Sequence, residues 1–172
     1  MKCNFSNIVI LGFILFGLFF LNEARADTIK PLANKSGFKM KIVEKGRYLS
    51  RISGCNDCHT AGYLQSEGKM SEDLWLSGDT FGWNGSWGTT YGTNLRLLIN
   101  DLMEKEWIEF ATTLKVRPPM PWFNLNAMTQ EDLRAIYQFI RYMGPRGNPA
   151  PEYVPAGKKP TGPYAIFPLP PK

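Results

Sequence analysis

Apolar residues recur at helical spacing in three segments of the chain, residues 38–53, 104–114 and 130–143. Each segment gathers its apolar residues on one face, so we expect three amphipathic helices that share a core. The first segment contains Gly46, and glycine weakens a helix because its backbone has more freedom to lose on folding. A close crossing by another helix at Gly46 is therefore predicted.

The ends of the second and third helices follow from the residues beside them. Arg117-Pro118-Pro119 stops the second helix, because a proline ring cannot continue a helix and restricts the residue before it. Thr129 can cap the third helix, and Asp132 in its first turn suits the positive end of the helix dipole. Gly144-Pro145 ends it.

Two stretches lack a helical pattern. Residues 75–94 alternate glycines with aromatic side chains, which predicts a long ordered loop whose rings pack on an apolar partner. Residues 144–172 are rich in proline, which predicts an extended tail with no helix or sheet of its own.

The N-terminus has the pattern of an export signal. Lys2 precedes an apolar run over residues 8–21, and Ala24-Arg25-Ala26 is a small-x-small cleavage site. The run is shorter than the roughly 20 apolar residues that cross a membrane. We expect residues 1–26 to be a signal peptide cleaved after Ala26, with the periplasm as destination. Membrane attachment follows only if this segment is retained.

Composition narrows the function further. Residues 27–172 have the length of one domain, which we divide into a folded part, 27–143, and the tail, 144–172. A hydrophobic fraction of 44% excludes a disordered or collagen-like chain. The net charge of +5 comes without a long run of like charges, so no nucleic-acid binding is predicted.

The whole chain has three Cys and one His. Without Cys3, which lies in the predicted signal, the remaining Cys55, Cys58 and His59 form one C-x-x-C-H motif. Two thiols at this spacing can add to both vinyl groups of one haem, and the adjacent imidazole then lies under the iron. The motif predicts one covalent haem c on Cys55 and Cys58, with His59 as the proximal axial ligand.

Three other uses of the motif are weighed against haem c. A structural zinc site needs four Cys or His ligands, and the motif supplies three. A redox-active C-x-x-C pair follows a strand, whereas the residues before Cys55 have a helical pattern. A disulfide across this short loop in an exported, non-haem protein stays open as an alternative.

The second axial ligand is expected to be a methionine, because the chain has no second His. Met120 lies in the sequence Arg117-Pro118-Pro119-Met120-Pro121-Trp122, where three prolines stiffen the backbone around it. Helix and core positions account better for Met40, Met103, Met128 and Met143, and Met70 follows His59 by only eleven residues, a short span to wrap around the haem edge. Met120 is therefore the predicted distal ligand, and a gap-filling core methionine is the alternative.

Over residues 39–144 the chain resembles class I c-type cytochromes, and among them the monohaem cytochromes that serve bacterial periplasmic dehydrogenases. The segments that carry the resemblance are residues 46–49, 55–59, 87–95, 120–122 and 131–137. It implies an all-α cytochrome c fold of three to five helices around one haem, with Gly46 of the first helix near Tyr137 of the last.

The haem surroundings are less well defined by the sequence. Candidate contacts to the haem or its propionates are Tyr91, Asn94, Arg96, Arg117 and Trp122. These cytochromes commonly use a proline carbonyl soon after the haem histidine to accept its other ring N–H, but no proline lies between His59 and Pro118. Another acceptor is expected.

The expected function is that of an electron carrier rather than an enzyme, since His and Met together saturate the iron. A periplasmic dehydrogenase is the expected electron donor, and an oxidase or another cytochrome the acceptor. The alternative is a five-coordinate haem c protein that binds a gas or acts on peroxide. The tail is expected to wrap the domain, anchored by Tyr153, Tyr164 and Phe167, rather than to dock on a partner.

Overall fold

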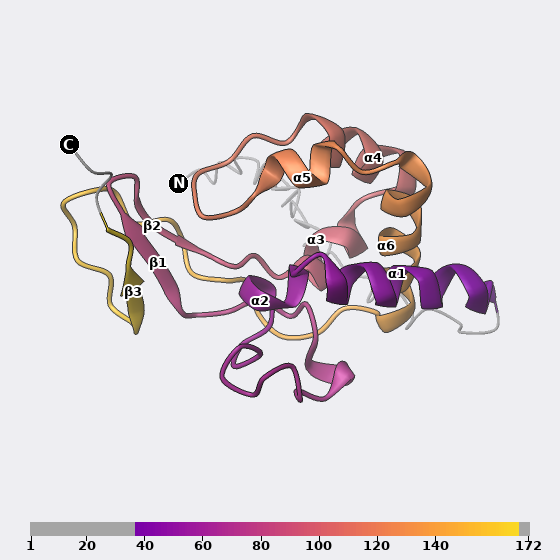
Figure 1. The fold of residues 1–172 in the computed structure, drawn as a ribbon, viewed down its shortest axis with the longest axis horizontal. Coiled ribbons are helices and arrows are strands. Elements are labelled where there is room, and N and C mark those ends of the chain that lie inside the picture. The colour runs from indigo at the N-terminus through magenta and orange to yellow at the C-terminus, as the bar shows by residue number, and fades with distance from the viewer. Residues whose placement is uncertain (1–36, 169–172) are drawn as a thin grey trace, which may run out of the picture.

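The computed structural model describes residues 37–168. The predicted signal peptide, residues 1–26, lies outside this range. In chain order the elements are α1 (Met40–Ile52), α2 (Cys55–His59), η2 (Glu72–Leu74), β1 (Gly82–Gly85), β2 (Gly88–Tyr91), α3 (Leu95–Asp101), α4 (Glu104–Thr113), α5 (Trp122–Asn126), α6 (Gln130–Met143) and β3 (Tyr164–Ile166). Figure 1 shows the strands gathered at one end of the molecule, away from α1, α4 and α6.

The prediction of an all-α fold is wrong. The described residues form six α-helices and a three-stranded mixed sheet of order β2-β1-β3, so the fold is mixed α/β. Strands β1 and β2 are antiparallel, with Gly82 opposite Tyr91, and β3 runs parallel to β1 with Tyr164 opposite Gly82. Residues 75–94 were predicted to be a long loop because of their glycines. The aromatic and threonine residues between these glycines favour strands, and β1 and β2 form there.

The tail also departs from the prediction. It was expected to have no sheet of its own, but residues 164–166 form β3 on the hairpin of β1 and β2. Phe167, just beyond β3, packs its ring against Trp83 and Trp87. The expectation that the tail wraps the domain is confirmed, and the tail contributes a strand while doing so.

The crossing predicted at Gly46 is present between α1 and α6, the indigo and orange helices of Figure 1. A Cβ atom added to Gly46 would overlap the carbonyl oxygen of Ala135 and come within 2.7 Å of the Cβ of Phe139. The residues of α6 that meet Gly46 are thus Ala135 and Phe139. Tyr137 lies between them in sequence, and its hydroxyl donates to the carbonyl of Leu102 at 3.0 Å. Only glycine lets the two backbones approach this closely.

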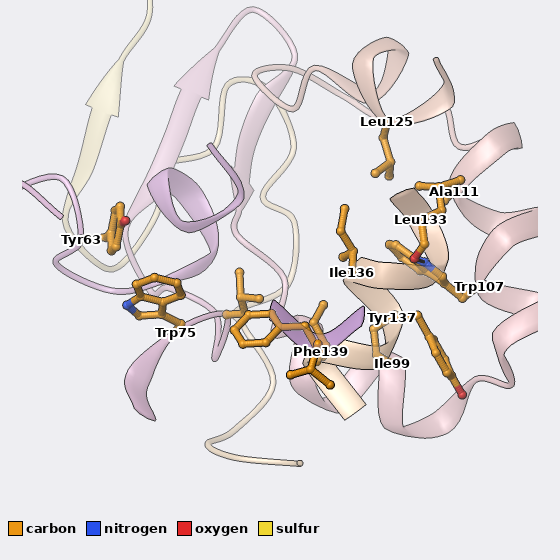
Figure 2. Close-up of a cluster of buried hydrophobic side chains, with 13 residues drawn as sticks. Tyr63, Trp75, Ile99, Trp107, Ala111, Leu125, Leu133, Ile136, Tyr137 and Phe139 are labelled. Carbon is orange, nitrogen blue, oxygen red and sulfur yellow. Dashed lines mark hydrogen bonds between the residues drawn. The ribbon is translucent and has the colours of Figure 1, made fainter. Parts of the chain in front are cut away.

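The core lies where α6 meets α1, α3 and α4, and Figure 2 shows its side chains. Trp107 of α4 is buried and its indole nitrogen donates to the carbonyl of Leu133 at 2.8 Å. Trp75 packs edge-on against Tyr63 and Phe139, so the loop after α2 joins the same core. This core holds the helices that carry the walls of the site described next.

The predicted boundaries of two helices are confirmed. The second predicted helix is α4, and the third is α6, where the Thr129 hydroxyl accepts from the backbone N–H of Asp132 at 3.1 Å. The short helices α2, α3 and α5 were not predicted from the sequence. Of the described helices, none is long and apolar enough to cross a membrane.

Candidate functional site

The C-x-x-C-H motif forms the short helix α2 directly after α1. Gly54 connects the two helices with a positive φ of 71°, a conformation that favours glycine. Residues three and four apart share one face of a helix, so Cys55, Cys58 and His59 point to the same side. All three line one cavity.

This cavity has a volume of about 600 Å³ and mostly apolar walls. Helices α3, α4, α5 and α6, strand β2 and the tail all contribute side chains to it. The apolar side chains include Leu95, Leu98, Trp107, Phe110, Leu125 and Ile136. A large apolar cavity with a few polar groups is typical of a site for an organic cofactor.

The imidazole of His59 is buried and held by one hydrogen bond. Its Nδ1 atom lies 2.7 Å from the carbonyl oxygen of Thr93. Since a carbonyl only accepts, Nδ1 carries the proton, and Nε2 keeps its lone pair for a ligand bond. Burial lowers the pKa of His59, which favours the neutral form that coordinates a metal, and the bond to Thr93 opposes this shift in part.

The carbonyl of Thr93 is thus the acceptor that was expected for the second ring N–H of His59. The backbone beside it approaches α2 closely, because a Cβ on Gly92 would overlap the carbonyl oxygen of Cys58. Asp79 N–H donates to the Gly92 carbonyl at 3.0 Å, and Gly78 N–H donates to the His59 carbonyl at 2.8 Å. Gly78 and Gly92 therefore let the chain approach α2 closely. In the sequence, these glycines were the available indication that this segment contacts the motif.

The two thiols are free rather than joined in a disulfide. Burial raises the pKa of Cys55 to about 11 and also raises that of Cys58, where the charges of Asp57 and Asp79 add to the effect. A redox-active C-x-x-C pair needs a lowered thiol pKa instead. These thiols and the helix before them are therefore unlike such a pair.

The described residues contain no group of three or more His, Cys, Asp or Glu side chains arranged to hold a metal ion.

Met120 lines the same cavity as Cys55, Cys58 and His59. It is half-buried and lies just before α5, where the Trp122 N–H donates to its carbonyl at 2.9 Å. The Thr90 hydroxyl of β2 donates to the carbonyl of Pro118 at 2.8 Å and ties this segment to the hairpin.

Met128 also lines the cavity, from the segment between α5 and α6. Its predicted role is helix packing, and it does pack against the core. Met40 and Met103 are exposed, with 44% and 66% of their surface accessible. Met120 and Met128 are accordingly the two methionines that the structure brings to the cavity.

The five candidate haem contacts divide into two groups. Tyr91 and Arg117 line the cavity, and Asn94, Arg96 and Trp122 do not. Trp122 packs its ring edge-on against Phe123. The structure therefore does not bring these three side chains to the cavity.

Asn94 and Arg96 hold the start of the tail instead. The Asn94 side chain caps α3 and donates to the carbonyls of Arg146 and Asn148 at 2.7 and 3.0 Å. Arg96 is buried and donates to the carbonyls of Asp73 and Gly144 at 2.7 and 2.6 Å. Polar residues close to a cofactor motif can equally serve as helix caps and backbone ties.

No known protein family, curated protein or solved structure matches the chain. A cofactor for this site must therefore be judged from the donors it contains. Two thiols at thioether spacing, an imidazole with Nε2 unprotonated and a thioether sulfur line one apolar cavity, and this donor set fits haem c.

Proposed function

We propose that the protein is an exported electron carrier that binds one haem c in this cavity. Cys55 and Cys58 would hold the porphyrin through thioether bonds, and His59 and Met120 would be the axial ligands. The observation that carries the proposal is that these four residues line a single apolar cavity although Met120 lies far from the motif in sequence.

The residues of the chain have separate tasks in this proposal. When bound, the haem would supply one-electron exchange between ferric and ferrous iron. The bond from His59 to Thr93 keeps the imidazole in one orientation, and a hydrogen bond from the other ring nitrogen of a ligating histidine increases the basicity of the ligand. The apolar walls limit water at the site, and a methionine ligand raises the reduction potential. Since His59 and Met120 would both bind the iron, the chain would leave no position there for a substrate, which favours electron transfer.

The proposal includes two redox-protein partners, one electron donor and one electron acceptor. A periplasmic dehydrogenase would give one electron to the haem, and in a second, separate step the reduced haem would pass this electron to an oxidase or another cytochrome. The predicted signal peptide supports export to the compartment where haem c is attached. The net charge of the whole chain is +5, of which the predicted signal peptide contributes only +1, and a mildly basic protein suits association with acidic partners.

The first test is whether haem becomes covalently attached. The full chain is expressed with its signal in a strain that matures haem c, and its pyridine haemochrome spectrum is recorded. One covalent haem per chain is expected, and Cys55→Ala with Cys58→Ala should abolish covalent attachment. Denatured protein that releases its haem, or contains none, would contradict the proposal.

The second test assigns the distal ligand. Oxidised wild-type protein should show the weak near-infrared band of a methionine-to-iron bond. Met120→Leu should lose this band, and the matched variant Met128→Leu should keep it, because leucine fills a similar volume at both positions. The opposite result transfers the ligand role to Met128. High-spin ferric iron in the wild type would favour the five-coordinate protein.

A further inference from the structure

The proline-rich tail returns to the cavity after leaving α6. Pro151 and Tyr153 are among the residues that line the cavity. Beside them, Thr89 of β2 and Val154 exchange two backbone hydrogen bonds of 2.8 and 3.0 Å. Further on, β3 pairs with β1, so the tail holds both edges of the hairpin (Figure 1). A segment tied at two edges has a fixed path across the cavity.

Tyr153 connects the hairpin turn to the segment that carries Met120. Its hydroxyl donates to the carbonyl of Trp87 at 2.8 Å, and a Cβ on Gly88 would come within 2.8 Å of its ring. The guanidinium carbon of Arg117 lies 4.0 Å from the centre of the same ring. This distance is well within the range of a cation–π interaction.

The segment before Met120 depends on such ties. Residues 115–118 are exposed and lie between α4 and α5, outside any helix or strand. Arg117 is held by the tail through Tyr153, and Pro118 is held by the hairpin through Thr90. Two neighbouring residues are thus fixed from two different elements, close in sequence to the proposed ligand.

We propose that Tyr153 is a positioning residue for Met120, and that the tail acts through it as a strap that orders residues 117–121 over the cavity. This inference rests on the proposed function for the role of Met120 as ligand. Tyr153 itself does not bind the iron. It limits the motion of Arg117 and thereby the freedom of the methionine three residues further on.

The test uses the full chain with its haem attached and compares Tyr153→Leu with the wild type. Tyr153→Phe keeps the ring and removes the hydroxyl, and Tyr48→Leu is the matched control, because Tyr48 is an exposed tyrosine of α1. Hydrogen exchange is measured over residues 114–125, and free imidazole is titrated as a competitor of Met120 for the ferric iron.

In Tyr153→Leu we expect exchange over residues 114–125 to become about two- to five-fold faster and imidazole to bind more tightly by a similar factor. Tyr153→Phe should lie closer to the wild type, and Tyr48→Leu should equal it. Arg117→Gln leaves the tail in place and should reproduce the effect of Tyr153→Leu. The double variant should then show little additional change.

Unchanged exchange in both Tyr153→Leu and Arg117→Gln would overturn the inference. So would faster exchange in Tyr48→Leu of the same size. If the wild type lacks the methionine-to-iron band while Tyr153→Leu still speeds exchange, the strap is supported and the ligand assignment of the proposed function fails. The two proposals are therefore separated by independent measurements.

Discussion

The Nδ1 atom of His59 lies 2.7 Å from the carbonyl oxygen of Thr93, a residue 34 positions further along the chain. This bond joins α2 to the end of the hairpin, so the orientation of the imidazole depends on where the hairpin lies. The hairpin is in turn tied to Pro118 through Thr90 and to the tail through Val154. The supports of both proposed axial ligands therefore meet in one hairpin.

Gly92→Ala tests the approach of the hairpin to α2. The added Cβ would overlap the carbonyl oxygen of Cys58, so the hairpin must shift and the bond between His59 and Thr93 should lengthen or break. We expect the free energy of unfolding to fall by about 1–3 kcal/mol. The yield of covalent haem should fall as well. Urea unfolding and haem content per chain are the measurements.

Gly37→Ala is the control for this variant. No atom lies within 4 Å of a Cβ added there, so its stability should change by less than about 0.5 kcal/mol. Equal stability of the Gly92→Ala and Gly37→Ala variants would show that the hairpin does not contact α2 as described.

Thr90→Val removes the hydroxyl that donates to Pro118 while keeping a similar shape. The loss of one hydrogen bond should lower the free energy of unfolding by about 0.5–1.5 kcal/mol. In the haem-loaded protein proposed above, imidazole should also displace Met120 more readily, because residues 117–121 lose the bond to Thr90. Thr90→Ser retains the donor and should recover most of both properties. A serine variant as impaired as the valine variant would mean that packing, and not this bond, is responsible.

The helices could be predicted because their signals are local. Apolar spacing, the cap at Thr129 and the prolines after residue 116 act within a few residues, and α4 and α6 were located from them. The sheet could not be found this way, because β3 pairs with β1 across a long stretch of chain. Strands β1 and β2 were not predicted either, because glycine is unfavourable in strands and residues 75–94 contain several glycines.

The site was partly accessible from sequence for the same reason. The C-x-x-C-H motif and the prolines around Met120 are both local patterns. The residues that they identify, Cys55, Cys58, His59 and Met120, all line the cavity. Thr93 was missed because it acts through a backbone carbonyl, which its residue type does not reveal. The bonds from the Arg96 guanidinium to backbone carbonyls could not be predicted either, because the same side chain can equally bind a carboxylate.

Gly46→Ala tests the crossing of α1 and α6. Alanine should strengthen an isolated helix by up to about 1 kcal/mol. In the folded protein its Cβ would overlap the carbonyl of Ala135, and we expect a net loss of at least about 2 kcal/mol. Circular dichroism of a peptide spanning residues 38–54 measures the expected gain in helix stability. Urea unfolding of the protein measures the expected loss in its free energy of unfolding. A more stable protein would refute the close crossing.

Asp132→Asn should reveal a pH-dependent contribution at the start of α6. Lys45 and the Thr129 hydroxyl both donate to the Asp132 carboxylate at 2.8 Å, and these bonds lower the pKa of Asp132. A lowered folded-state pKa stabilises the protein above the unfolded value, about 3.9, and this stabilisation disappears as pH falls through the folded value. We expect Asp132→Asn to lower the free energy of unfolding by less than about 1 kcal/mol at pH 7, because the side chains of Lys45 and Asp132 are partly exposed, at 38% and 26%, and by less as the pH falls toward 2.

The matched control is Glu131→Gln, which also removes a carboxylate that accepts from Lys45 but leaves the bond from Thr129 to Asp132 intact. Its loss at pH 7 should be smaller than that of Asp132→Asn, and added salt should reduce it further. Urea unfolding at pH 7 and pH 2 measures both variants. If the difference between wild type and Asp132→Asn persists at pH 2, the carboxylate charge is not its source. The cap geometry at Thr129, which is independent of that charge, would then be the cause.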